Sequence, residues 1–177
     1  MTCVVALKQN NKVYMGCDSI SVSGDTYTLT GDVKVFKKDK MIFGCAGSVR
    51  ARQILQYNFK IPKQKTKNDH EYMCTDFISE LQNTFKDTHF GTQKSIEGSN
   101  FIVGYNNNIY VIYSDYQVNI NSHDYVSIGS GTDFSNGSLC TTKNMNILPE
   151  EKIRLALKAA EAHCTTVHGP FVIIEGI

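Results

Sequence analysis

The residue that could carry chemistry at the start of this sequence is Thr2, which directly follows Met1. A small second residue lets an aminopeptidase remove the methionine, and the chain would then begin with threonine. An α-amine has an unperturbed pKa of about 7.7–8.0, so a good fraction of it is neutral near pH 7. Such an amine can take the proton from the hydroxyl of its own residue, which is one form of nucleophilic catalysis. Threonine at position 2 is common, so this residue alone is a weak signal.

Two charged residues, Asp18 and Lys34, could tune that nucleophile. If the strands around residues 3–8 and 12–18 form a hairpin, Asp18 lies close to the start of the chain. A buried lysine needs a carboxylate partner, and Asp18 is a candidate for that role. The positive charge would disfavour protonation of the α-amine and help to ionise the hydroxyl. The alternative is that both residues are ordinary surface charges.

The elements that must position these residues follow from the hydrophobic pattern. Asn10 and Asn11 suit a tight hairpin turn between the first two strands. Residues 19–31 are rich in Ser, Thr, Gly and Asp, which predicts a loop or an irregular edge. Short apolar runs predict strands over residues 3–8, 12–18, 33–36, 40–46, 100–105, 109–113, 125–127 and 171–175.

Apolar residues at three- and four-residue steps predict helices over 49–57 and 69–86, and Asn68 or Asp69 could cap the second. A final helix begins at Pro149, a favoured first helical position, and two glutamates follow it where they suit the positive helix end.

Hairpin-linked strands with helices grouped in runs predict an α+β fold with antiparallel sheets. Four layers, with two sheets inside and helices outside, would use these elements fully as an αββα sandwich. The chain contains no repeat, low-complexity tract or linker that would divide it. We therefore expect a single domain over residues 1–177.

Composition excludes several functional classes. The 177 residues carry 18 Lys and Arg against 17 Asp and Glu, so there is no basic excess to bind nucleic acid. Hydrophobic residues make up 41% and charged residues 20%, which is typical of a globular protein and not of a disordered one. No apolar run reaches the roughly 18 residues of a membrane helix, so no membrane association is expected.

The first ten residues predict a strand and not a secretory signal, which favours a cytoplasmic protein. The six cysteines form no CxxC pair and no zinc-like spacing with histidine, so we expect neither a metal nor a cofactor. His163 and Cys164 could suggest a Cys/His dyad, but neighbouring residues on a helix point in different directions.

Several short motifs occur in the order found in one known family. They are TCVV at 2–5, GCDS at 16–19, VKVF at 33–36, IFGCAG at 42–47 and SIGSG at 127–131. In this set and its spacing, the sequence resembles proteasome-type β subunits of the N-terminal nucleophile (Ntn) hydrolases. The closer likeness is to the bacterial proteasome-related peptidase HslV, which also has a cysteine near the end of its penultimate helix, as Cys164 is here.

The resemblance implies a role for five residues. Thr2 would be the nucleophile, Lys34 would tune it, and Asp18 would hold Lys34 and the N-terminus. The backbone N–H of Gly44, preferred here over Gly47, would stabilise the oxyanion. Ser130 would form a hydrogen bond near the Thr2 amine.

The resemblance also implies a threonine-type endopeptidase that cleaves unfolded polypeptides inside a homo-oligomeric ring, expected to be a double hexamer. An ATP-dependent unfoldase could supply the substrate. Two alternatives stay open: a catalytically inactive structural or assembly subunit of the same fold, and an Ntn amidase that acts on a small amide.

Three positions depart from the family pattern. Val33 precedes Lys34 where the family usually has a second lysine. Arg50 and Arg52 occupy the stretch in which the family has an aspartate early in its first helix. Cys164 and Val167 stand where proteasome β subunits carry Asp and Ser.

Overall fold

The computed structural model describes residues 2–92, 95–96 and 98–176. Its strands are β1 (Cys3–Gln9), β2 (Lys12–Cys17), β3 (Ile20–Ser23), β4 (Thr26–Leu29), β5 (Val35–Lys38), β6 (Met41–Ala46), β7 (Asn100–Tyr105), β8 (Asn108–Ile112), β9 (Val118–Ile120), β10 (Tyr125–Gly129) and β11 (Val172–Glu175). Its helices are α1 (Val49–Gln53), α2 (Asp69–Tyr72), α3 (Ile78–Asp87), α4 (Thr132–Thr142) and α5 (Pro149–His163). A π-helical turn over Ile54–Asn58 extends α1, and another over Met73–Phe77 joins α2 to α3.

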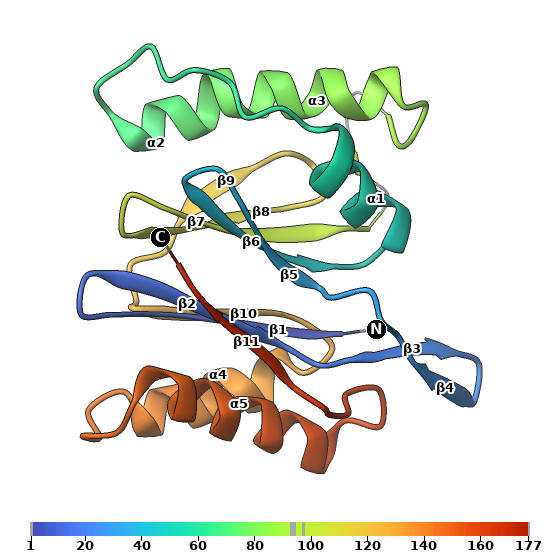
Figure 1. Cartoon of the computed structure of the whole chain (residues 1–177), viewed down its shortest axis with the longest axis vertical. Coiled ribbons are helices and arrows are strands. Elements are labelled where there is room, and N and C mark those ends of the chain that lie inside the picture. Colours follow the sequence, from blue (N-terminus) through green and yellow to red (C-terminus); the bar gives the residue numbers. More distant parts are fainter. Residues whose placement is uncertain (1, 93–94, 97, 177) are drawn as a thin grey trace.

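The elements stack in four layers (Figure 1). One sheet has the strand order β10-β1-β2-β11 and the other has the order β5-β6-β7-β8-β9, and all neighbouring strands in both are antiparallel. Helices α1 to α3 cover the second sheet, and α4 and α5 cover the first (Figure 1). The predicted α+β sandwich with two antiparallel sheets between helices is therefore confirmed.

Strand β1 explains how the layers are held together. Successive side chains of a strand point to opposite faces of the sheet. Val4 accordingly packs with Met15 and Ile42 between the two sheets. Val5 packs with Leu157 against α5. Because both faces of β1 are covered, its sequence is an unbroken apolar run and not an alternating one.

A third apolar cluster lies between the other sheet and helices α1 to α3. It contains stacked aromatic rings, among them Phe43 and Phe77, whose centroids are 6.5 Å apart. The stepwise apolar residues that predicted the helix over 69–86 supply this cluster, and Asn68 caps the helix through its side chain, which accepts from the backbone N–H of Glu71. Both predictions are thus confirmed.

Three strand predictions need correction. Residues 19–31 were expected to be a loop or irregular edge, but they contain the hairpin β3–β4. The two strands of this hairpin pair only with each other, β4 is exposed throughout, and Ile20 is the only buried residue of β3, so little in the sequence marks the hairpin. Strand β9, a short strand with little burial, was not expected either. Lys37 and Lys38, expected to join two strands, belong to β5.

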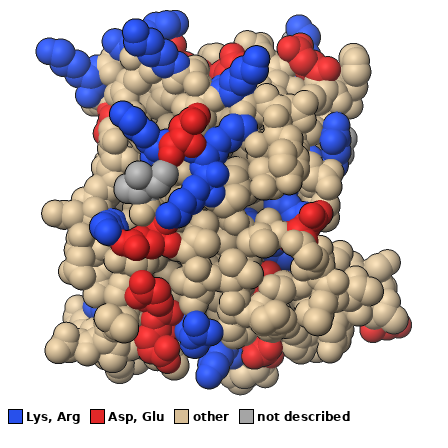
Figure 2. Space-filling view, viewed as in Figure 1, with Lys and Arg blue, Asp and Glu red and all other residues tan. Residues whose placement is uncertain are grey.

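Charges of both signs are interspersed on the face shown in Figure 2. No helix within the described residues is long and apolar enough to cross a membrane.

Candidate functional site

The hairpin of β1 and β2 determines what lies next to Thr2. Asn10 and Asn11 adopt positive φ angles of 52° and 59°, as a tight turn between twisted strands requires. The resulting register places Val4 opposite Cys17, so Asp18, which follows β2, lies beside Cys3, the first residue of β1 and the neighbour of Thr2. The carboxylate Oδ1 of Asp18 accepts a 2.8 Å hydrogen bond from the backbone N–H of Cys3.

Asp18 also holds Lys34. The Lys34 ammonium lies 2.7 Å from Asp18 Oδ2 and donates a second hydrogen bond, of 2.6 Å, to the carbonyl oxygen of Ile20. The exposed fraction is 7% for the Lys34 side chain and 0% for that of Asp18. Two residues that the sequence allowed to be surface charges are therefore a buried ion pair, whose two charges each need the other.

The turn after β10 reaches Thr2 from the other side. Strand β10 pairs with β1 so that Gly129 lies opposite Cys3. The backbone N–H of Thr2 donates to Ser130 Oγ at 3.3 Å, and Ser130 Oγ lies 3.2 Å from the Thr2 carbonyl oxygen, to which it donates. Gly129 has φ = 100°, and a Cβ there would collide with the Thr2 carbonyl. Only glycine allows this close approach.

Sequence reasoning missed Thr166, which follows the end of α5. Its Oγ1 lies 2.9 Å from Ser130 Oγ and 3.1 Å from the Sγ of Cys164. The sequence comparison had instead considered Cys164 and Val167 for this region, and Val167 is fully buried against α5. A hydroxyl residue just beyond the helix, where the related subunits carry polar side chains, was the available signal.

These hydrogen bonds affect the thiol of Cys164. Burial raises the pKa of this thiol, but hydrogen bonds from Thr166 and Ser130 together lower it by more. The pKa of Cys164 therefore lies below its ordinary value. The Cys/His dyad, which the sequence disfavoured, gains no support, because the neighbouring His163 stacks on Phe134 at a centroid distance of 5.1 Å.

Thr2 opens onto a cavity of about 190 Å³. The lining includes the predicted nucleophile Thr2, the lysine expected to tune it, Lys34, and the residues that lead into α1. The lining residues are Thr2, Ile20, Ser21, Val22, Thr30, Lys34, Cys45, Gly47, Ser48, Val49 and Arg52.

Of the two glycines weighed from the sequence, the structure brings Gly47 to this cavity, while Gly44 is not part of the lining. Gly44 lies inside β6, opposite Val35 of β5 and Ile102 of β7, and a Cβ there would meet Val4 between the sheets. Gly47 forms the turn after β6 with φ = 115°. The geometry therefore favours the backbone of Gly47 as the oxyanion donor.

Cys45 is another nucleophilic group in the lining, but its environment keeps it inert. Burial raises the pKa of its thiol well above the ordinary value. Since the thiolate is the reactive form of cysteine, this group stays unreactive near neutral pH. The cavity lining includes no histidine that could activate it.

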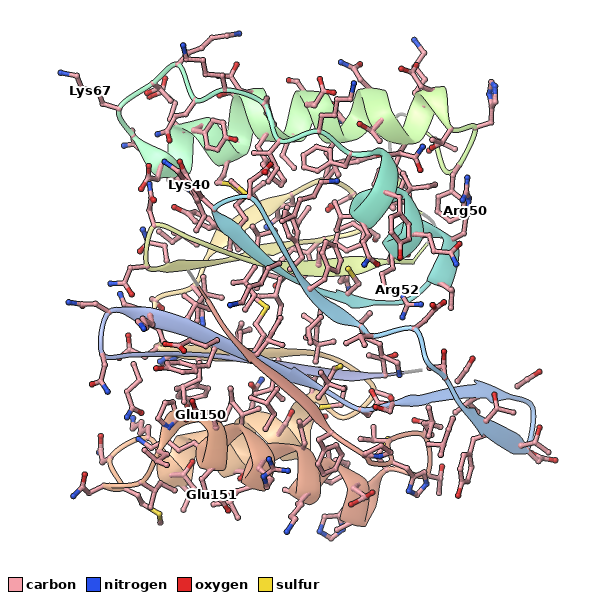
Figure 3. The ribbon with its side chains drawn as sticks, viewed as in Figure 1. Lys40, Arg50, Arg52, Lys67, Glu150 and Glu151 are labelled. Atoms are coloured by element: carbon pink, nitrogen blue, oxygen red, sulfur yellow. The ribbon has the colours of Figure 1, made fainter. Side chains whose placement is uncertain are left out.

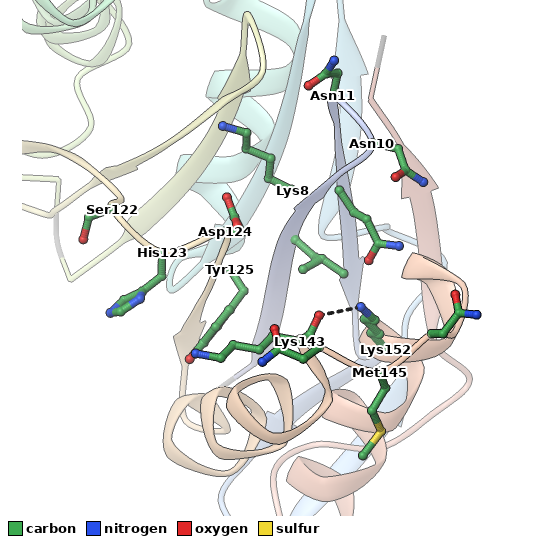
Figure 4. Close-up of a pocket in the computed structure, with 14 residues that line it drawn as sticks. Lys8, Asn10, Asn11, Ser122, His123, Asp124, Tyr125, Lys143, Met145 and Lys152 are labelled. Carbon is green, nitrogen blue, oxygen red and sulfur yellow. Dashed lines mark hydrogen bonds between the residues drawn. The ribbon is translucent and has the colours of Figure 1, made fainter.

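A larger hollow, of about 620 Å³, lies at the opposite end of β1 (Figure 4). It is lined by polar residues that include Lys8, Asp124 and Lys143, and the buried Lys152 donates to the Lys143 carbonyl at 2.8 Å. None of the site residues predicted from the sequence lines it. Across residues 2–92, 95–96 and 98–176, no group of three or more His, Cys, Asp or Glu is placed to hold a metal ion.

Solved structures share the fold across nearly the whole chain. The structure of BPH from Thiobacillus denitrificans in complex with epoxomicin has a TM-score of 0.84 at 14% identity, covering 98% of this chain and 97% of that one. Eukaryotic HslV from Trypanosoma brucei has a TM-score of 0.73 at 16% identity, covering 98% of both chains. An Anbu (Gly-1) mutant from Hyphomicrobium sp. strain MC1 has a TM-score of 0.70 at 13% identity, covering 98% of this chain and 80% of that one.

These identities are similarly low, so they establish a shared fold and do not establish the closer likeness to HslV that the sequence suggested. A comparison with curated proteins gives no match. The model of the family described as "Proteasome subunit" matches residues 1–166. Because this match spans most of the chain, the protein belongs to the proteasome subunit family.

Proposed function

We propose that this protein is a threonine-type endopeptidase whose nucleophile is Thr2 after removal of Met1. The observation that carries the proposal is the buried ion pair of Asp18 and Lys34, because Lys34 lines the same cavity as Thr2. Burying two charges costs free energy unless the charges pair with each other. Charged groups that shift the pKa values of their neighbours are concentrated at active sites. We further propose that residues 1–177 act as one domain.

The reaction follows from the residues at the site. The Thr2 amine takes the proton from Thr2 Oγ, and Oγ attacks the carbonyl carbon of a peptide bond. The ammonium of Lys34 favours the neutral amine and the ionised hydroxyl. The backbone N–H of Gly47 donates to the oxyanion of the tetrahedral intermediate, in place of the Gly44 expected from the sequence.

The intermediate then collapses. The C–N bond breaks, the ammonium of Thr2 gives its proton to the leaving amine, and an ester links the acyl group to Thr2 Oγ. Water attacks this ester while the amine accepts the proton, which releases the carboxylic acid and restores Thr2. Ser130 holds the backbone of Thr2 during both steps, and Thr166 holds Ser130.

Substrate and assembly belong to the same proposal. Members of the proteasome subunit family form oligomeric rings, and we propose that this chain forms a homo-oligomeric ring, expected to be a double hexamer, that encloses Thr2. Its substrates would be unfolded polypeptides delivered by an ATP-dependent unfoldase. We place this activity in the cytoplasm, as the sequence suggests.

Intact mass spectrometry tests the central claim. The protein is weighed before and after incubation with a set of peptide epoxyketones that differ in the residue next to the epoxyketone. Such compounds react with both the hydroxyl and the amine of an N-terminal threonine. We expect loss of the methionine mass and one adduct per chain, and Thr2→Ala should take up none. A retained methionine with no adduct would contradict the proposal and favour a structural subunit of the same fold.

A substrate panel separates the peptidase from an amidase. Unfolded proteins and peptides should be cleaved, and cleavage of small amides alone would favour the amidase.

A further inference from the structure

The cavity beside Thr2 contains a second buried cation, Arg52. Its side chain is 6% exposed and belongs to α1, one turn after Gly47. It donates to the carbonyl oxygen of Asp32 at 3.2 Å and to Asp32 Oδ2 at 3.1 Å. Figure 3 shows Arg52 directed toward the segment that leads into β5, whereas Arg50 lies on the outer side of the same helix.

The two partners of this ion pair have unequal surroundings. The side chain of Asp32 is 56% exposed, so water and salt screen its charge. The guanidinium of Arg52 is buried, and its charge is screened much less. A guanidinium also carries five N–H donors in one plane, of which the bonds to Asp32 use two. The group that dominates the field inside the cavity is therefore the cation.

The size of the cavity indicates what could enter it. Pockets that hold whole small ligands measure about 300–1,000 Å³. The volume here is about 190 Å³, which suits one side chain of a longer substrate. Ile20, Val22 and Val49 supply an apolar wall for methylene groups, and Arg52 supplies the polar end.

In the proposed peptidase function, this cavity takes the side chain of the substrate residue whose carbonyl Thr2 attacks. On that basis we propose that Arg52 makes the cavity select aspartate or glutamate. A carboxylate can accept two parallel hydrogen bonds from a guanidinium, which are stronger than bonds between neutral groups. The carboxylate of the substrate would displace the exposed carboxylate of Asp32 from Arg52, or it would share the guanidinium with Asp32.

Other side chains fit the cavity less well. A large apolar side chain would remove water from Arg52 without replacing its hydrogen bonds, which is unfavourable. A basic side chain would meet Arg52 and Lys34 in the same small space. It could pair only with Asp32 at the rim.

The test uses peptides that differ only at the residue before the cleaved bond. Glutamate is compared with glutamine, its neutral isostere, and with leucine and lysine. We expect kcat/KM for glutamate to exceed that for glutamine by about 10- to 100-fold, the range for a buried hydrogen bond to a charged group. Equal rates for glutamate and glutamine, or a preference for leucine or lysine, would overturn the inference.

Matched variants test whether Arg52 causes the preference for glutamate. Arg52→Gln should bring the glutamate-to-glutamine ratio close to one, and Asp32→Asn, which removes the competing carboxylate, should raise it. Arg50→Gln, on the same helix and exposed, should leave the ratio unchanged. If Arg52→Gln alone destabilises the fold by leaving Asp32 unpaired, the double variant Arg52→Gln/Asp32→Asn removes both charges and should also lose the preference.

Labelling of Thr2 by peptide epoxyketones that carry glutamate, glutamine or leucine next to the epoxyketone separates this inference from the function on which it rests. Labelling and peptide cleavage without a glutamate preference would refute the role of Arg52 and leave the peptidase proposal intact. Absence of both labelling and cleavage would refute the peptidase proposal, and the inference would fall with it.

Discussion

Lys34 Nζ and Asp18 Oδ2 lie 2.7 Å apart in a part of the molecule that water hardly reaches. The other carboxylate oxygen of Asp18 accepts from the backbone of Cys3, so one carboxylate connects the lysine to the first residues of the chain. This arrangement couples the geometry of the proposed nucleophile to an ion pair that contributes to folding as well.

Replacing Asp18 with asparagine should affect both stability and activity. The change leaves the Lys34 ammonium buried without a counter-charge, which costs about 3–5 kcal/mol in the free energy of unfolding. We expect a lower midpoint in urea denaturation and strongly reduced peptide cleavage.

Lys34→Met tests the same pair from the other side, since it leaves the Asp18 carboxylate unpaired. The double variant Asp18→Asn/Lys34→Met should recover much of the stability but none of the cleavage. Wild-type cleavage in Asp18→Asn would remove this residue from the active site.

Gly129→Ala should disturb Thr2 directly. Gly129 has φ = 100°, where other residues are strained, and the new Cβ would collide with the carbonyl oxygen of Thr2. A displacement of about 1 Å at a reacting group can lower the rate about 100-fold. We expect a loss of that order in kcat/KM for a peptide substrate.

Gly137→Ala is the matched control, because Gly137 lies in α4 and a Cβ there would meet nothing within 4 Å. It should leave cleavage unchanged and slightly raise stability, since alanine favours a helix over glycine. Equal activity in the two variants would show that the turn after β10 does not position Thr2.

Thr166→Val should weaken catalysis without weakening substrate binding. The variant keeps the shape of the side chain but removes the hydroxyl that lies 2.9 Å from Ser130 Oγ. Ser130 then holds the Thr2 backbone less firmly, and we expect kcat to fall about tenfold, as for the loss of one hydrogen bond. KM should be unchanged, and Thr166→Ser should restore kcat. An effect on KM alone would contradict a positioning role.

Stability should decrease at alkaline pH because of a buried thiol. Burial raises the pKa of Cys17 to about 11 in the folded protein, from an ordinary value near 9. A raised pKa means that the folded state binds the proton more tightly. The stabilisation is therefore complete below about pH 9 and is lost as the pH rises from 9 to 11.

The difference of about two pKa units corresponds to roughly 3 kcal/mol. Urea denaturation at pH 8 to 11 measures it, and Cys17→Ala should reduce the slope of stability against pH. Cys3, whose pKa burial raises to about 12, contributes a further decrease that persists in that variant. An identical slope with and without Cys17 would refute the assignment.

Local sequence determined most of the secondary structure of this protein. The final helix begins at Pro149 as predicted, and the hairpin turns at Asn10 and Asn11. These features depend on residues close together in the chain, namely helix starts, turn residues and the periodicity of buried positions. The hairpin β3–β4 was not predicted because β4 is exposed throughout and Ile20 is the only buried residue of β3, so no repeated pattern of buried positions marks it.

The composition of the candidate site was decided only by the tertiary structure. Thr2 and Ser130 are 128 positions apart, and they meet because β10 pairs with β1. Sequence spacing suggested Asp18 and Lys34, which lie on adjacent segments, but it preferred Gly44, which does not line the cavity, and it missed Thr166, which lies beside Ser130. Which glycine reaches the cavity and which hydroxyl reaches Ser130 follow from how sheets and helices pack, and not from any local preference of the chain.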